Sequence, residues 1–370
     1  TISSRGEVTN ISYFAISVTG KLYSWGNNTW GQLGINSNTA QANPTLVSAF
    51  SGKIITQVSV SGNNGMHVGC IDSTGQAYAW GYGGNLANCN PFGNGASNTA
   101  LLTPYTIPGG TNVKKIICNG QYESAGTASR NYTLLLKNDG TVWACGTNDR
   151  GQLGVGNTTH RNTFAQCIYT TGNPVTNAVD IYAGETYVGG ASVIIDSSGI
   201  LHFSGYSNSS CFGDGTGESN HLNFNNTATL NNAGFQGKML YDPIIGIQPK
   251  VIVNGTNKHG NSWTVVLDNT GTIWGCGYNT TGQFGYLPLS GQQATFVKGI
   301  VNANGAKIVD MVTTGYPSTA EDYGTILALS DGTMMAAGYN VAGALGFETS
   351  PSSQYIGYFK YLIGFAPFNM

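Results

Sequence analysis

Residues 24–34 read SWGNNTWGQLG: a Trp-Gly, an Asn pair, then Gly-x-Leu-Gly. The arrangement recurs in three close and two looser copies: ACGTNDRGQLG (144–154), GCGYNTTGQFG (275–285), AAGYNVAGALG (336–346), AWGYGGNLANCNPFG (79–93) and FSGYSNSSCFG (203–213). Recurrence at intervals of several tens of residues is typical of a repeat fold and not of a single binding loop. We therefore predict that Gly31, Leu33 and Gly34 serve the fold, and that the leucine fills a core.

Two further markers occur in the same order in six units. One is an apolar run that ends in Gly, at Gly6, Gly62, Gly120, Gly184, Gly255 and Gly315. The other is a turn that ends in Gly, at Gly20, Gly75, Gly140, Gly199, Gly271 and Gly332. In residues 131–146, NYTLLLKNDGTVWACG, this turn joins two apolar runs, and Asx-Gly favours a tight β-hairpin.

A later run such as NPTLV (43–47) completes a unit of four strands. One such unit cannot bury both of its faces, whereas several units stacked radially can. We therefore predict an all-β fold, a β-propeller of six (alternatively seven) four-stranded antiparallel blades, in a single domain over residues 1–370. The expected blade units are roughly 1–50, 51–107, 108–175, 176–246, 247–302 and 303–370.

The segments YSWGNNTWGQLG, VWACGTNDRGQLG and IWGCGYNTTGQFG resemble the regulator-of-chromosome-condensation repeat. The resemblance covers nearly the whole chain and is weaker around Trp80 and Gly205. It implies a blade-type propeller, usually of seven blades, whereas six units are counted here. Two arrangements fit this count: the tail YFKYLIGFAPF (358–368) completes the first blade as a closing clasp, or a seventh blade begins upstream of Thr1.

The composition argues against several classes of partner. Only 9% of the residues are charged, the net charge is −2, and the basic residues form no run, so nucleic-acid binding is disfavoured. No apolar run approaches 18 residues, so no membrane insertion is expected. The seven cysteines contain no CxxC pair, and Cys145 and Cys276 take the place of Trp25 and Trp80 in other units. We expect buried free thiols and folding in a reducing compartment.

The strand order places the Asx-Gly hairpins at one edge and long, divergent loops at the other, and binding residues usually lie on such loops. Aromatic residues recur at this second edge and form the candidate ligand-binding set: Tyr82, Tyr206, Tyr278, Tyr339, Trp30, Tyr122, Tyr187, Trp263 and Tyr316. Tyr and Trp suit protein or sugar recognition. Alternatively, the repeated tyrosines simply pack against the next blade. The long segment 213–250 is either a contact arm or a tolerated surface loop.

No catalytic constellation stands out. The five histidines are scattered without metal-ligand spacing, and no nucleophile elbow or phosphate-binding loop occurs. The sequence therefore predicts a protein that is not an enzyme, with no catalytic residues, metal or cofactor.

Three functions remain in view. The favoured one is a binding or structural propeller of a virion surface (a phage or virus tail fibre, attachment or decoration protein) that recognises a host-surface glycan or protein through one loop-rich edge. Its partners would be that receptor or other virion proteins, an oligomer is compatible with it, and its place would be the virion surface or the extracellular space. The alternative is a secreted or cell-surface bacterial adhesin or protein inhibitor. The family resemblance also suggests a nucleotide-exchange factor for a small GTPase, although the chain lacks a basic tail.

Overall fold

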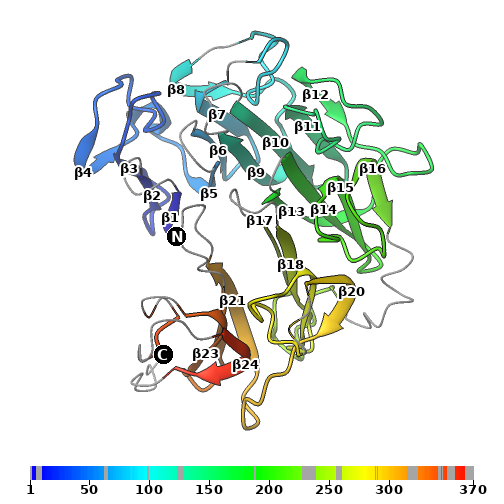
Figure 1. Cartoon of the computed structure of the whole chain (residues 1–370). Helices are drawn as coiled ribbons and strands as arrows, with labels where there is room; N and C mark the ends of the chain where they lie inside the picture. The colour runs from blue at the N-terminus through cyan, green and yellow to red at the C-terminus, as the bar shows by residue number, and fades with distance from the viewer. Residues whose placement is uncertain are drawn as a thin grey trace. The chain divides into compact units, whose positions relative to one another are not determined.

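The computed structural model describes residues 2–5, 11–61, 66–84, 86–97, 100–122, 129–186, 189–226, 239–255, 261–287, 289, 291–314, 324–340, 343, 345–347 and 355–362. The described residues form 24 strands and one 3-10 turn, Ser48–Phe50, and they contain no α-helix. The strands make six four-stranded sheets, in which sheet order follows chain order (Figure 1). The all-β class and the count of six blades are thus confirmed.

The first three sheets cover the N-terminal half. The first consists of β1 (Ile2–Arg5), β2 (Ser12–Ile16), β3 (Leu22–Gly26) and β4 (Gln41–Leu46). The second consists of β5 (Ile55–Val60), β6 (His67–Asp72), β7 (Ala77–Tyr82) and β8 (Ala100–Thr106). The third consists of β9 (Val113–Tyr122), β10 (Ser129–Lys137), β11 (Val142–Gly146) and β12 (Arg161–Gln166).

The other three sheets repeat the pattern. The fourth consists of β13 (Ala178–Thr186), β14 (Gly189–Asp196), β15 (Leu201–Ser207) and β16 (Ser219–Asn226). The fifth consists of β17 (Lys250–Gly255), β18 (Ser262–Leu267), β19 (Ile273–Tyr278) and β20 (Gln292–Lys298). The sixth consists of β21 (Ile308–Thr314), β22 (Gly324–Leu329), β23 (Met334–Tyr339) and β24 (Tyr355–Tyr361).

The final strand corrects one prediction about the tail. Strand β24 pairs with β23, with Tyr339 opposite Tyr355 and Met335 opposite Tyr361, so it completes the sixth sheet. The first sheet already has four strands of its own, beginning with β1. The closing clasp on the first blade was therefore wrong for the described part of the tail, and residues 363–368 lie outside the described residues. A seventh blade upstream of Thr1 stays a prediction.

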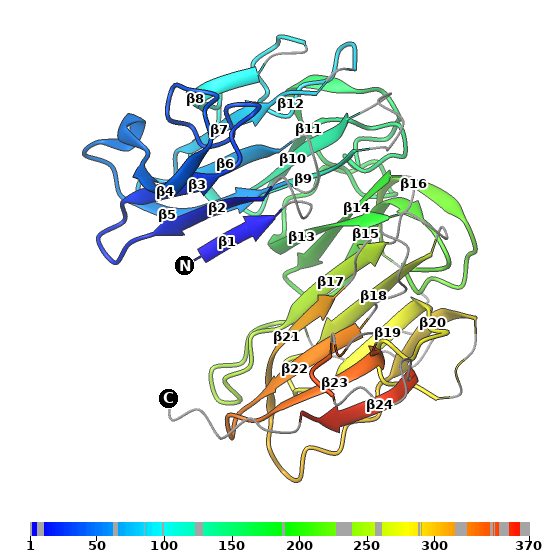
Figure 2. The ribbon, with the colours of Figure 1, turned by 60° about the vertical axis from the view of Figure 1, so that its left-hand side comes forward.

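By its contacts the chain divides into two compact units. One comprises Thr1–Glu185 with His221–Asn225, and the other comprises Thr186–Asn220 with Asn226–Met370. Figure 2 shows the ribbons of both. The single-domain organisation stays a prediction.

The repeated motif supplies the core, as expected. Its Leu or Phe is fully buried in all six units: Leu33, Phe92, Leu153, Phe212, Phe284 and Leu345. Leu33 packs in one cluster with Phe14 and Trp80. Gly34 has φ +70°, and a Cβ there would lie 2.7 Å from Trp80 Nε1, so only glycine fits this close approach.

The recurring spacing inside the motif is held by a buried asparagine, as two units show. Asn28 Oδ1 accepts from the Leu33 amide at 2.9 Å, and its Nδ2 donates to the carbonyls of Ser37 and Thr39. Asn148 makes the same set of bonds in the third unit, from the Leu153 amide and to two later carbonyls. The asparagine thus holds the loop in place while the apolar side chain enters the core, because a buried backbone group needs a partner.

The strand registers confirm the expected arrangement of edges. In the fifth sheet Gly255 pairs with Ser262, and Trp263 pairs with Gly277, so the first and third strands end at the same edge. We call this the loop edge. The turns between second and third strands, such as 268–272, lie at the opposite edge, which we call the hairpin edge.

Candidate binding surfaces

The four repeated tyrosines lie where the sequence placed them. Tyr82, Tyr278 and Tyr339 each end the third strand of their sheet, and Tyr206 is the last residue but one of its strand. All four lie at the loop edge, and each side chain is half-buried. They are therefore neither core residues nor freely exposed. Their surroundings decide what each can contact.

One of these tyrosines packs against a neighbouring sheet and still leaves an aromatic surface exposed. The ring of Trp30, from the loop after β3, lies 4.4 Å from the ring of Tyr82, with planes tilted by 39°. Trp30 is 39% exposed. The pair combines blade packing with a surface that another ring or a sugar face could stack on.

The sixth sheet offers a second exposed aromatic pair. Tyr339 stacks on Tyr355 with ring centroids 4.7 Å apart and planes 18° from parallel, and Tyr355 is 54% exposed. In the fourth sheet, the Tyr206 hydroxyl instead donates to Glu218 at 3.1 Å. The repeated tyrosines therefore have different surroundings in different sheets.

Trp263 requires a correction. Its side chain is completely buried and belongs to the core cluster that contains Phe284 and Leu327, so it cannot touch a partner at the surface. Trp263 falls inside strand β18 and not on a turn. The side chain of Tyr122 and the whole of Tyr187 and Tyr316 lie outside the described residues, as do residues 227–238 of the long segment 213–250.

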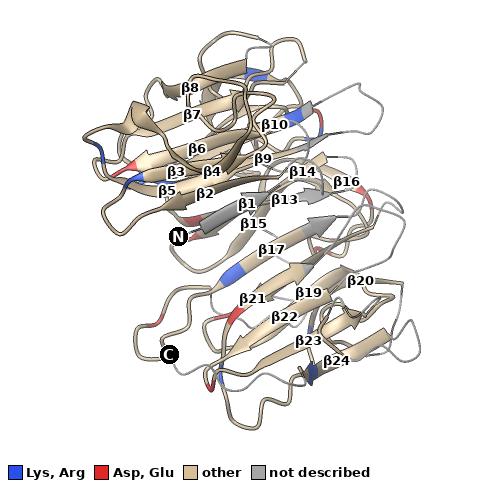
Figure 3. Cartoon of the chain, turned by 90° about the vertical axis from the view of Figure 1, so that its left-hand side faces the viewer, with Lys and Arg blue, Asp and Glu red and all other residues tan. Residues whose placement is uncertain are grey.

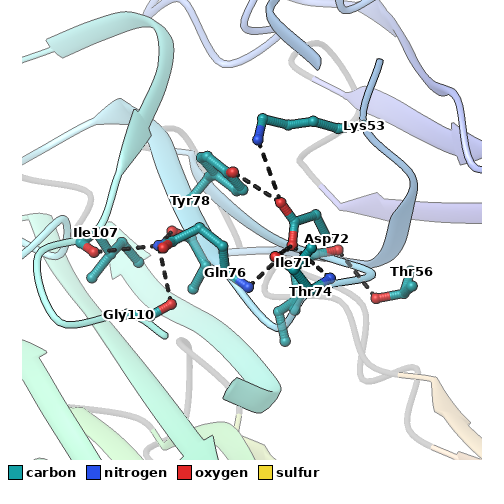
Figure 4. Close-up of polar contacts among 10 residues, drawn as sticks. Lys53, Thr56, Ile71, Asp72, Thr74, Gln76, Tyr78, Ile107 and Gly110 are labelled. Carbon is teal, nitrogen blue, oxygen red and sulfur yellow. Dashed lines mark hydrogen bonds and ion pairs between the residues drawn. The ribbon is translucent and has the colours of Figure 1, made fainter. Parts of the chain in front are cut away.

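A polar cluster on the hairpin edge of the second sheet was not predicted as a site (Figure 4). Asp72 Oδ1 accepts from the Thr74 amide at 2.9 Å and from the Gln76 amide at 3.1 Å, and Oδ2 accepts from the Tyr78 hydroxyl at 2.9 Å. Lys53 Nζ lies 3.6 Å from Oδ2 and 5.4 Å from the centre of the Tyr78 ring.

The pKa shifts indicate the charge states of the groups in this cluster. Burial raises the pKa of the Asp72 carboxyl, but hydrogen bonds from Thr74, Tyr78 and Gln76 lower it by more, so the net shift is downward. Burial raises the pKa of Tyr78, and the Tyr78 hydroxyl raises the pKa of Lys53. At neutral pH the carboxylate is charged, the phenol is neutral and the ammonium is charged. Neither Lys53 nor Tyr78 is activated as a nucleophile, so the geometry fits turn stabilisation or binding.

Three of the four arginines of the chain gather at the loop edge of the third sheet. Arg130 lies in β10, Arg150 follows β11, and Arg161 begins β12 opposite Gly146. Arg130 Nε is 3.0 Å from Asp149 Oδ2, whereas the buried Nε of Arg161 has no hydrogen-bond partner among the described residues. This cluster was not predicted from the sequence, because its members are separated along the chain and reach the same edge only when β10, β11 and β12 pair. Elsewhere charged residues are sparse (Figure 3).

The described residues lack two features that would point to other functions. They contain no group of three or more His, Cys, Asp or Glu side chains that could hold a metal ion. Among them, too, no helix has the length and apolar character needed to cross a membrane.

Comparison with known proteins identifies the repeats. Models of the regulator of chromosome condensation (RCC1) repeat match residues 19–68, 125–152 and 139–189. The human E3 ubiquitin-protein ligase HERC2 is 32% identical over 153 residues, which is 39% of this chain and 3% of HERC2. The ultraviolet-B receptor UVR8 of Arabidopsis thaliana is 27% identical over 146 residues, which is 38% of this chain and 29% of UVR8. The matched regions are small parts of both relatives.

Solved structures extend the likeness to the whole chain at the level of fold. Human WBSCR16 superposes with a TM-score of 0.64 at 15% identity, covering 98% of this chain and 81% of its own. Prp20p of Saccharomyces cerevisiae gives a TM-score of 0.63 at 15% identity, covering 97% and 76%. With its recurring Gly-Gln-Leu-Gly motif and six four-stranded sheets, the chain is an RCC1-like β-propeller.

Proposed function

We propose that the chain is a non-catalytic binding propeller that recognises a host-surface glycan or protein through its loop edge, as part of a virion surface. The observation that carries the binding role is the Trp30–Tyr82 pair, because a large aromatic side chain that is 39% exposed and held by a second ring is a ready contact surface. The stacked Tyr339–Tyr355 pair offers the same chemistry. The virion and extracellular location rests on the very low charge and on the amide- and hydroxyl-rich composition.

A protein with an acidic surface is the second candidate partner. The arginine cluster of Arg130, Arg150 and Arg161 would favour an acidic surface on such a partner, since arginine pairs well with carboxylates. Prp20p has been studied for binding to Gsp1p and histones. A secreted or cell-surface adhesin or inhibitor would use this edge in the same way, and a nucleotide-exchange factor for a small GTPase is the least favoured form of the proposal.

The test compares binding by the whole chain and by two variants, Trp30→Ala and Tyr355→Ala, on a glycan array, on intact cells and on a set of purified surface proteins. Tyr241→Ala is a matched control, because Tyr241 is 53% exposed and Tyr355 is 54% exposed. The expected result is loss of binding in the two variants, with binding by the control unchanged and with at most a small decrease in the melting temperature of each variant. Unchanged binding in both variants would show that the loop-edge aromatics do not contribute to receptor binding. Absence of binding to every surface would contradict receptor recognition itself.

A further inference from the structure

A cavity of about 240 Å³ lies at the outer part of the third sheet, away from the loop-edge aromatics. Its walls are the side chains of Leu135 and Lys137 from β10, Trp143 from β11, and Thr163 and Phe164 from β12. Gly93 and the turn Pro108–Gly109, which connects β8 to β9, complete the lining. All of these residues belong to the N-terminal compact unit.

The packing of the second and third sheets explains why the space remains. Leu135 lies in the buried cluster with Ile107 and Ile116, whereas Trp143 and Phe164 are only partly buried at its margin. Gly93 touches the Phe164 ring so closely that a Cβ there would lie 2.4 Å from it. The second sheet thus contributes Gly93 and the turn Pro108–Gly109 to the lining, and none of its described large side chains is among the lining residues.

The lining of the cavity is largely apolar and carries one positive charge. Lys137 Nζ lies 5.3 Å from the centre of a Trp143 ring, and its ammonium forms no ion pair with the described residues. The carboxylate of Asp139, on the same hairpin, accepts hydrogen bonds from the amide and the hydroxyl of Thr141. Trp143 Nε1 already donates to Thr141 Oγ1 at 3.1 Å, so the indole offers its ring face. A ligand here would stack on the indole and pair with the ammonium.

We propose that this cavity binds a small aromatic carboxylate. Its volume is below the usual range of about 300–1,000 Å³ for ligand pockets, so it suits one ring system and not an oligosaccharide. The lining contains few hydrogen-bonding groups, which disfavours a neutral sugar, and the unpaired ammonium selects an acid over a neutral analogue. The ring would lie between Trp143 and Phe164, with its carboxylate at Lys137.

The experiment measures binding of indole-3-acetate and of its neutral analogue indole-3-acetamide to the whole chain by calorimetry and by ligand-observed NMR. We expect the acid to bind roughly tenfold more tightly than the amide, because one desolvated ion pair contributes about this factor. Lys137→Gln should remove that preference while leaving the affinity for the amide unchanged. Lys21→Gln, at an exposed lysine of the first-sheet hairpin, is the matched control and should change nothing.

Trp143→Ala should abolish binding of both compounds. Trp143→Phe keeps an aromatic ring in the cavity and serves as a second variant in case Trp143→Ala does not fold. Equal affinities for acid and amide, or a preference that persists in Lys137→Gln, would overturn the role of the ammonium. Absence of binding of either compound at about 10 mM, which is a very weak affinity, would overturn the site itself. Trp30→Ala should leave these affinities unchanged, so failure of the loop-edge proposal and failure of this one are distinguishable.

Discussion

The imidazole Nε2 of His67 lies 3.0 Å from Thr133 Oγ1, and that hydroxyl donates to the Pro91 carbonyl at 2.7 Å. Because the hydroxyl hydrogen is used, His67 Nε2 must be the donor between the two side chains. Nδ1 is buried and has no hydrogen-bond partner among the described residues. The geometry therefore holds a neutral imidazole in the interior.

This histidine makes stability depend on pH. Burial lowers the pKa of His67 from 6.5 to about 3, so between these values the unfolded chain binds a proton that the folded chain does not. Stability is full above pH 6.5 and falls as the pH decreases toward 3, by at most about 1.4 kcal/mol per pH unit from this group. Urea unfolding at pH 7, 5 and 4 measures the slope. His67→Gln should unfold more easily at pH 7 and show a shallower slope; an unchanged slope would contradict this origin.

Hairpin carboxylates should differ in importance according to burial. Buried Asp268 accepts from the Thr270 and Thr272 amides and from Trp274 Nε1, so Asp268→Ala leaves several donors unpaired and should cost about 2 kcal/mol or more. The exposed Asp139 accepts from the amide and hydroxyl of Thr141, and water can replace this carboxylate as their partner. Asp139→Ala should therefore cost no more than about 0.5 kcal/mol. Denaturant unfolding compares the two, and equal costs would refute the argument.

The two tryptophans that the sequence placed in one candidate set should behave oppositely. Trp263→Ala removes a fully buried side chain and should destabilise the fold by about 3–5 kcal/mol. Trp30→Ala loses one surface ring contact and should cost about 1 kcal/mol or less. Thermal melting of both variants distinguishes core from surface. A similar loss in both would mean that Trp30 is also a core residue.

The thiols should be unreactive until the chain unfolds. All seven cysteines are free and buried, and burial raises the pKa of Cys89 to about 11 and of Cys118 and Cys211 to about 12. Little thiolate therefore exists at pH 8 in the folded state. An aromatic disulfide reagent should label no thiol in buffer and all seven in guanidinium. Rapid labelling of the native chain would show that a thiol is accessible.

Much of the fold could be read from the sequence because its determinants are local. The turn residues, the motif leucine and the glycine at 34 recur in recognisable form, and the structure gives them the expected roles. The hydrogen bond from the Leu33 amide to Asn28 was not predicted. The candidate aromatics were less predictable. Trp263 resembled a turn residue because the number of residues between the first and second strands differs among the units, and a shift of a few residues moves a side chain from an edge into a strand.

The sequence by itself determined the repeat, the four-strand unit, the hairpin turns and the buried position of the motif leucine, since these depend on neighbours close in the chain. Only the tertiary structure decided which aromatics remain exposed, where three arginines gather, and that a cavity opens beside Trp143. Those features depend on what a neighbouring sheet brings to a face from tens of residues away. Strand alternation specifies which face a side chain occupies, but not what packs against it.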